Sequence, residues 1–345
     1  MSIILQGGPD VSARETLKPV LSIKDLSVSY TTGLGTVSAV DGVSLDINAG
    51  EIFGLAGESG CGKSTIANAI MRLLQSPAKV TGGSIELNQR NVLRLSDEEL
   101  RRTRWREMSM VFQSAMNAMN PVMTIGEQIM DVFTTHEKMP KKEARERAAH
   151  LLSLVDIKAD RLKSYPHQLS GGMRQRVVIA IALALNPSLL IMDEPTTALD
   201  VVVQRDIMAQ IKELQQSLGF SVLFITHDIS LMVEFSHRMA VMYAGRLVEV
   251  APSNGLLDDP LHPYTMALMN AFPPLSGPRT ELLGLPDAPP SSAGRPSGCS
   301  FHPRCPMAVD SCRIQDPVLR PAAETHDAAC LLVPEFVAPS ERRAQ

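Results

Sequence analysis

The chain has 345 residues, of which 44% are hydrophobic and 20% charged, a composition ordinary for a folded protein with a full-sized core. A formal net charge of −4 and an aromatic content of 4% argue against a broad nucleic-acid-binding surface. The longest apolar stretch, residues 177–192, is interrupted by Asn186 and Pro187, and the N-terminus lacks a signal-peptide pattern. We therefore expect a cytosolic chain that reaches a membrane only through partner subunits.

The first quarter of the chain alternates strand-like and loop-like segments. Residues 1–20 have no periodicity and are expected to form a flexible leader. From Leu21 the stretch LSIKDLSVSY alternates apolar and polar residues, which is typical of a half-buried strand. VSLDI is a second such strand, and EIFGLAG is a short apolar strand that feeds a glycine-rich loop. The helix-like stretch STIANAIMRLL follows that loop.

Further along, helical and strand-like segments alternate. Residues 96–106 begin with Ser and place acidic residues before basic ones, which predicts a helix. Helices are also predicted at 140–157, at 172–185 and in the segment VVVQRDIMAQIKELQQSL. The apolar runs LLIMDEP (189–195) and SVLFITHD (221–228) read as buried strands. Such alternation predicts an α/β fold with a mainly parallel sheet.

The strongest chemical signal is Gly57-Glu58-Ser59-Gly60-Cys61-Gly62-Lys63-Ser64-Thr65. It fits GxxxxGK[ST] and lies between a predicted strand and a predicted helix, as a phosphate loop does. Its glycines let backbone N–H groups face phosphates, and the helix N-terminus adds a favourable potential. Lys63 is expected to reach the β- and γ-phosphates and Ser64 to ligate Mg²⁺. The segment therefore predicts ATP and Mg²⁺ as cofactors.

An acidic pair, Asp193-Glu194, ends the buried strand of residues 189–195. Asp193 is placed to hold Mg²⁺ through water, and Glu194 to act as general base on the attacking water. Acidic pairs at strand ends are also common in solvated turns. The functional interpretation of Asp193-Glu194 is favoured because this pair follows a phosphate loop in the same predicted sheet.

Ser170, Gly171 and Gly172 precede a helix, so their free N–H groups form a second candidate anion site, or simply a helix cap. The stretch Leu169 to Arg176 resembles the signature motif of ABC-type ATPases, with Met173 where glutamine is usual. The resemblance implies a P-loop NTPase (RecA-like) ABC nucleotide-binding domain with a helical subdomain.

Four more motifs fit that family in order. The resemblance assigns Tyr30 to adenine stacking, Gln113 to sensing Mg²⁺ and the transmembrane partner, Ala198-Leu199-Asp200 to the D-loop, and His227 to the γ-phosphate. It also implies that the signature of one chain caps ATP held by the phosphate loop of another, so that an isolated chain cannot complete a site.

Three features narrow the resemblance. The stretch Gln113 to Gln128, the segment Asp259 to Thr265 and a cysteine-containing tail resemble the ATPases of oligopeptide/dipeptide/nickel importers, over about residues 21–333. The domains implied are a nucleotide-binding domain at 21–255, with its helical subdomain at about 96–185, and an extension at 256–345.

This branch implies partners at the cytoplasmic face of the cell (inner) membrane. They are two transmembrane permease subunits, a second related ATPase or a second copy of this chain, and an extracytoplasmic solute-binding protein, without nucleic acid. Di- or oligopeptides are the expected cargo, with nickel or oligosaccharides left open. A non-transport ABC ATPase of DNA repair or translation is disfavoured. Only 107 positions separate Lys63 from Ser170 (170 − 63), too few for the long coiled coil of DNA-repair types. Translation types usually carry two motor domains, whereas the sequence has a single nucleotide-binding fingerprint.

The tail holds four cysteines, namely Cys299, Cys305, Cys312 and Cys330. Their spacing, C-x5-C-x6-C-x17-C, is neither that of a zinc ribbon nor a common ferredoxin spacing. Four thiolates can hold a tetrahedral metal or a [4Fe–4S] cluster, and the resemblance implies the cluster, in a structural role. Zinc and four reduced thiols remain open, with His302 and His326 as substitute ligands.

Overall fold

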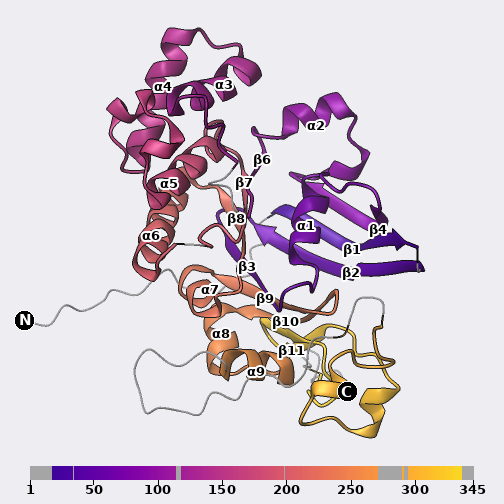
Figure 1. Ribbon diagram of the computed structural model, residues 1–345. Coiled ribbons are helices and arrows are strands. Elements are labelled where there is room, and N and C mark those ends of the chain that lie inside the picture. The colour runs from indigo at the N-terminus through magenta and orange to yellow at the C-terminus, as the bar shows by residue number, and fades with distance from the viewer. Residues whose placement is uncertain are drawn as a thin grey trace, which may run out of the picture.

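Two β-sheets form the body of the molecule (Figure 1). The computed structural model describes residues 18–33, 35–113, 118–197, 199–270, 290 and 294–335. Among these residues one sheet has the strand order β2-β1-β4-β5, and the other has the order β11-β12-β10-β9-β3-β8-β7-β6. The expected leader lies almost entirely outside the described residues.

The smaller sheet is antiparallel throughout. Its strands are β1 (Pro19–Thr32), β2 (Gly35–Asn48), β4 (Ala78–Leu87) and β5 (Arg90–Asn91). β1 pairs with β2 and with β4, and β4 with β5. The prediction of a mainly parallel sheet therefore fails here, because short connections such as the one between β1 and β2 allow only antiparallel pairing.

Five central strands of the larger sheet are parallel, as predicted. They are β3 (Ile52–Ala56), β6 (Met108–Val111), β7 (Leu189–Asp193), β8 (Ser221–Ile225) and β9 (Arg238–Tyr243). β3 lies between β8 and β9. These short strands are buried almost throughout, because both faces of the sheet are covered.

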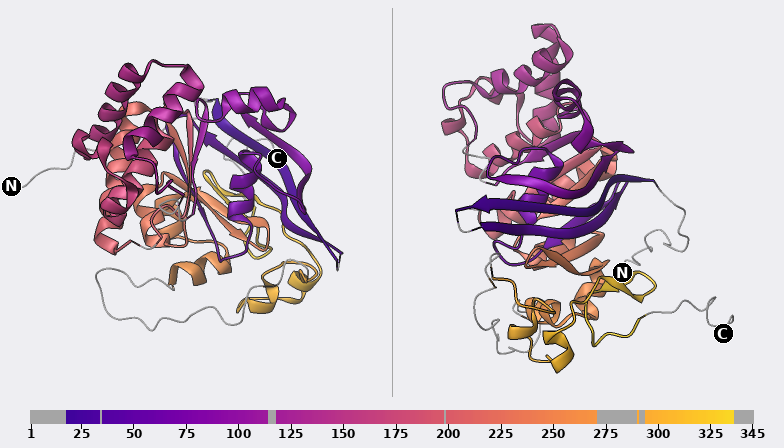
Figure 2. Two further views of the ribbon diagram at one scale, coloured as in Figure 1. Left: turned by 45° about the horizontal axis from the view of Figure 1, so that its top comes forward. Right: turned by 90° about the vertical axis from the view of Figure 1, so that its right-hand side faces the viewer.

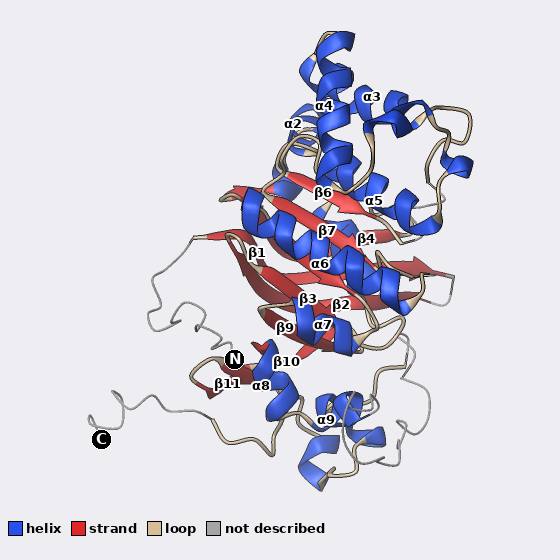
Figure 3. Cartoon of the chain, turned by 90° about the vertical axis from the view of Figure 1, so that its left-hand side faces the viewer, coloured by secondary structure: helices blue, strands red, loops and turns tan. Residues whose placement is uncertain are grey.

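The central sheet separates two hydrophobic cores. Along β7, Leu189 and Ile191 pack toward the smaller sheet, whereas Leu190 and Met192 pack toward the helices, as the two-residue period of a strand requires. Figure 2 shows helix α1 (Lys63–Ile70) between the two sheets. On the opposite face lie α5 (Gly171–Ala182), α6 (Val201–Leu218) and α7 (Ile229–Phe235), as Figure 3 shows.

A helical group stands beyond one edge of the central sheet, at the top of Figure 1. It contains α3 (Ile125–Glu137) and α4 (Lys141–Leu154), with α2 (Asp97–Thr103) nearby. The Ser96 side chain caps α2 together with Glu99. This capping box accounts for the helix predicted at 96–106. Short 3-10 helices lie at Val92–Arg94, Ala159–Lys163, Pro166–Gln168, His302–Arg304 and Asp310–Arg313.

The C-terminal part of the chain extends the central sheet. β10 (Arg246–Pro252) turns back along β9, and α8 (Ser253–Asp258) and α9 (Pro263–Asn270) follow. β12 (His326–Ala328) then pairs with β10, and β11 (Arg320–Ala323) with β12. Within the described ranges, no helix has the length and apolar character needed to cross a membrane.

Candidate nucleotide site

The phosphate loop connects the end of β3 to the start of α1. Gly57 and Gly62 have φ angles of 146° and 111°, which L side chains rarely adopt. A Cβ at Gly57 would lie 2.2 Å from the Met242 carbonyl oxygen, and one at Gly62 would lie 2.5 Å from the Ala39 carbonyl oxygen. The loop is therefore pressed against neighbouring backbone at both ends, and only glycine fits there.

The Lys63 ammonium lies inside the curve of this loop. Its Nζ donates to the carbonyl oxygens of Gly57 and Glu58, at 2.7 and 2.9 Å, and lies 3.6 Å from Cys61 Sγ. Burial raises the pKa of the Cys61 thiol, which therefore stays neutral beside the ammonium. A positive charge at a helix N-terminus with free N–H groups suits a polyphosphate.

Ser64 and Asp193 come together although 129 positions separate them. Ser64 lies in the first turn of α1 and Asp193 ends β7, and Ser64 Oγ donates to Asp193 Oδ1 at 3.1 Å. Burial raises the pKa of Asp193, and the hydrogen bond from Ser64 opposes that shift. A hydroxyl and a carboxylate are the oxygen donors that Mg²⁺ prefers, so these residues fit the expected ion.

Glu194 is the centre of a polar cluster from three segments. Gln113 Nε2 donates to its Oε2 at 2.9 Å, and Thr197 Oγ1 donates to the same oxygen at 3.2 Å. His227 Nδ1 lies 3.5 Å from the other oxygen, Oε1. The predicted catalytic residues Glu194, His227 and Gln113 therefore meet in space. Thr197 was not predicted, although it follows Glu194 in the turn after β7.

Tyr30 reaches the phosphate loop from the smaller sheet. It lies near the end of β1, and its hydroxyl is 3.4 Å from Oγ1 of Thr65. The aromatic ring is half-buried beside the start of α1. This contact brings Tyr30 to the loop but leaves its adenine-stacking role a prediction.

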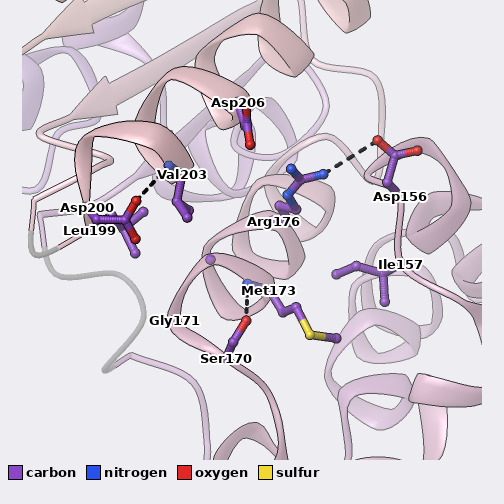
Figure 4. A pocket seen from close by; sticks show the side chains of 11 residues that line it. Asp156, Ile157, Ser170, Gly171, Met173, Arg176, Leu199, Asp200, Val203 and Asp206 are labelled. Atoms are coloured by element: carbon purple, nitrogen blue, oxygen red, sulfur yellow. Dashed lines mark hydrogen bonds and ion pairs between the residues drawn. The ribbon is translucent and has the colours of Figure 1, made fainter.

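The signature segment lines a different, open pocket of about 610 Å³ (Figure 4). Ser170 Oγ accepts the Met173 N–H at 3.3 Å and caps α5, while Asp200 Oδ1 accepts the Val203 N–H at 3.0 Å and caps α6. The two helix starts approach closely, since a Cβ at Gly172 would lie 2.7 Å from Val203 Cγ1. Ala198 lies outside the described residues.

The two predicted anion sites are separate within one chain. Ser170, Gly171 and Gly172 line the pocket, whereas none of its described lining residues belongs to the phosphate loop. Figure 1 shows α1 and α5 on opposite sides of the central sheet. The two candidate anion sites therefore lie apart within one chain.

The four tail cysteines gather near one another and form no disulfide. Burial raises the pKa of Cys299 to about 11; the Phe301 N–H, which donates to its sulfur, opposes this shift, and the other three thiols add to it to a smaller extent. The N–H of Met307 likewise donates to Cys305, and those of Leu332 and Val333 to Cys330. Such N–H donors stabilise a sulfur that carries negative charge.

The expected metal site is not supported by the residues as they stand. In the part of the chain that the structure describes, no group of three or more His, Cys, Asp or Glu side chains is arranged to hold a metal ion. One ring nitrogen of each proposed substitute ligand is engaged, since His326 Nε2 lies 2.6 Å from Glu249 Oε1 and His302 Nδ1 lies 3.0 Å from the Cys299 carbonyl oxygen.

The strand–loop–helix at Gly57–Thr65, the Ser64–Asp193 pair and the Glu194 cluster together define a P-loop ATPase. A family profile described as ABC transporter matches residues 40–197, and one described as oligopeptide/dipeptide transporter, C-terminal region, matches 248–312. The chain belongs to the ABC transporter family, as an ATP-binding subunit whose C-terminal region is of the oligopeptide/dipeptide transporter type.

Relatives and solved structures agree with this assignment. The chain is 44% identical to the dipeptide transport ATP-binding protein DppD of Bacillus subtilis, over 92% of this chain and 95% of that protein. It is 42% identical to DppD of Escherichia coli K12, over 90% and 96% of the two chains. The dimeric ATP-binding cassette MJ0796, bound to ADP and phosphate, aligns with a TM-score of 0.60 and 32% identity over 68% of this chain and 98% of its own.

Proposed function

We propose that this chain is the motor subunit of a peptide importer and hydrolyses ATP as one half of an ATP-sandwiching pair. The observation that carries the pairing is the separation of the phosphate loop from the Ser170 pocket within one chain. The names of the relatives, which are dipeptide and oligopeptide transport ATP-binding proteins, support the cargo class.

In the proposed site the loop from Gly57 to Thr65 holds the phosphates, and Lys63 binds the β- and γ-phosphates. Ser64, Asp193 and Gln113 would hold Mg²⁺, which neutralises charge that develops on the phosphates. Tyr30 stacks on adenine. The oxygen donors at Ser64 and Asp193 and the position of Tyr30 beside Thr65 support these roles.

Glu194 acts as the general base. Hydrogen bonds from Gln113 and Thr197 to Oε2 fix the carboxylate and leave Oε1 facing His227. Oε1 takes a proton from the attacking water, and His227 contacts the γ-phosphate. The N–H groups at Ser170, Gly171 and Gly172 of a second chain, with its Asp200 nearby, close the site from the other side.

The proposed assembly contains two transmembrane permease subunits, a second related ATPase or a second copy of this chain, and an extracytoplasmic solute-binding protein. The chain then works at the cytoplasmic face of the inner membrane. Nickel or oligosaccharides stay open as cargo, because the cargo is selected by the binding protein and the permeases. We also propose the division into a domain at 21–255, with a helical subdomain at about 96–185, and an extension at 256–345.

The base assignment is tested by Glu194→Gln in the complex co-purified with its membrane partners. We expect ATP binding within about twofold of the unchanged protein and turnover lowered at least about 100-fold, because only proton abstraction is lost. Glu234→Gln is the matched control, since Glu234 is half-exposed and pairs with Arg205 on the surface. Unchanged turnover in Glu194→Gln would remove Glu194 from the base role.

We further propose that Cys299, Cys305, Cys312 and Cys330 hold a structural [4Fe–4S] cluster. Backbone N–H donors to three of the four sulfurs support this, although the described residues form no ready site for a single metal ion. Iron and sulfide analysis after anaerobic purification should find both at about four per chain. Zinc without sulfide would contradict the cluster, and the absence of any metal would leave four reduced thiols.

A further inference from the structure

The C-terminal extension contacts the phosphate loop directly, at Glu58. The Glu58 N–H donates to the Tyr264 hydroxyl at 3.0 Å. Arg304 donates to both oxygens of the Glu58 carboxylate, at 2.8 and 3.0 Å. Tyr264 and Arg304 follow Glu58 by 206 and 246 positions, so two distant segments of the extension end on one residue of the loop.

The ion pair between Arg304 and Glu58 is shielded from water. The Arg304 side chain is 4% exposed and that of Glu58 is 23% exposed. Arg304 Nη1 also donates to the Tyr243 hydroxyl at 3.3 Å, so the guanidinium is held from two sides. A bidentate pair fixes both distance and orientation, and salt screens it far less than a surface pair.

An aromatic cluster stands behind these contacts. The ring of Phe301 lies 5.2 Å from that of Tyr243 and 5.4 Å from that of Tyr264, and the two tyrosine rings lie 4.6 Å apart. Phe301 and Arg304 both lie between Cys299 and Cys305 in sequence. The cysteine segment is therefore packed against the residues that contact Glu58.

Glu58 also contacts Lys63, the predicted phosphate-binding lysine of the loop. Its N–H is taken by Tyr264, its carboxylate by Arg304, and its carbonyl oxygen accepts from Lys63 Nζ at 2.9 Å. A shift of the Glu58 peptide therefore moves the carbonyl that holds the ammonium in the loop. We propose that Arg304 and Tyr264 are positioning residues for the phosphate loop, so that the extension sets the affinity of the chain for ATP.

A purely structural role, in which these residues only attach the extension, makes a different prediction. The extension is also attached by the pairing of β10 with β12, by the bond between His326 and Glu249, and by the ion pair between Arg246 and Asp316. Because these contacts do not involve Glu58, loss of Arg304 should leave the extension docked. A change in ATP affinity without loss of fold then reports positioning.

The test is calorimetric binding of a slowly hydrolysed ATP analogue with Mg²⁺ to the full chain. We expect Arg304→Met and Tyr264→Phe each to weaken binding by about tenfold. Arg304→Lys should recover part of the lost ATP affinity, because an ammonium keeps the positive charge but cannot form the bidentate hydrogen bonds. Arg304→Met should have almost no further effect in a Glu58→Gln background, since the two side chains act through one contact.

Arg320→Met is the matched control, because Arg320 donates to the Val333 carbonyl within the extension and does not touch the loop. Its ATP affinity should equal that of the unchanged chain. Wild-type affinity in Arg304→Met and Tyr264→Phe would overturn the proposal, as would equal losses in all variants together with a lowered melting temperature. The proposal rests on the ATPase motor proposed above. Binding of the ATP analogue is measured without transport, so a failure of peptide uptake would count against the proposed function and not against this proposal.

Discussion

His262 is a buried histidine whose ring accepts a backbone N–H from the first turn of α9. The ring Nδ1 accepts the Tyr264 N–H at 3.0 Å, and the backbone N–H of His262 donates to Glu249 Oε2 at 2.9 Å. Burial lowers the pKa of His262 to about 4. Burial alone would raise the pKa of Glu249, but hydrogen bonds, above all from His326, leave the pKa of this carboxyl below its usual value.

The His262 ring makes the chain less stable in mild acid. Between about pH 6.5 and pH 4 the unfolded histidine binds a proton that the folded one rejects, so stability falls as pH decreases through this window. We expect a loss of about 3 kcal/mol from this group across the window. Asparagine does not titrate in this window, and its amide oxygen can still accept the Tyr264 N–H, so the pH-dependent loss of stability should be smaller in His262→Asn.

Chemical denaturation of the unchanged chain and of His262→Asn at pH 7, 5.5 and 4.5 measures the difference in the pH dependence of their stability. His150→Asn is the control, because His150 is exposed on α4 and should leave the pH dependence unchanged. Parallel curves for the unchanged chain and His262→Asn would show that His262 is not kept neutral by burial.

Single residues of the nucleotide site were predictable where a local motif defines them. Lys63, Ser64 and Glu194 lie at fixed offsets from glycines or a strand end, and the structure brings Ser64 to Asp193 and Glu194 to Gln113 and His227. Their roles in catalysis stay predictions. The Glu58 contacts could not be predicted, because no local pattern pairs a loop carboxylate with an arginine 246 positions away.

At the scale of elements, the starts of several helices were predicted closely from the sequence. Ser96, Ser170 and Asp200 each accept a backbone N–H in the first turn of a helix, and those three starts were predicted to within a few residues. α3 was not predicted, although Thr124 and Glu127 form the same kind of capping box. The antiparallel pairings depend on turn geometry and were missed.

The cap of α6 can be tested by itself. Asp200→Ala removes the acceptor of the Val203 N–H and should cost about 1 kcal/mol of stability, whereas Asp200→Asn should cost much less, since asparagine caps as well. Urea unfolding of the full chain is the measurement. Asp206→Ala, an exposed change on the same helix, should stay close to the unchanged chain. Equal stability of Asp200→Ala and Asp206→Ala would show that the cap contributes little.

At the scale of the whole molecule, the parallel centre of the larger sheet was predicted from the alternation of strands and helices. The extension was recognised only through resemblance, and its attachment was not predicted. β12 continues the central sheet beyond β10, and α9 and the cysteine segment fold back beneath it (Figure 2). Pairing between strands some eighty residues apart leaves no mark on the composition of either strand.

The Arg304–Glu58 pair has a consequence for chimeras between motor domains and tails of different relatives. A tail carrying this arginine, grafted onto a loop with a neutral residue in place of Glu58, would bury a guanidinium without a counter-charge. Breaking a buried pair in this way costs about 3–5 kcal/mol, enough to undo much of a domain's stability. Tail and loop should therefore be exchanged as a matched set, and a recombinant library that respects this coupling should yield more soluble hybrids than one that ignores it.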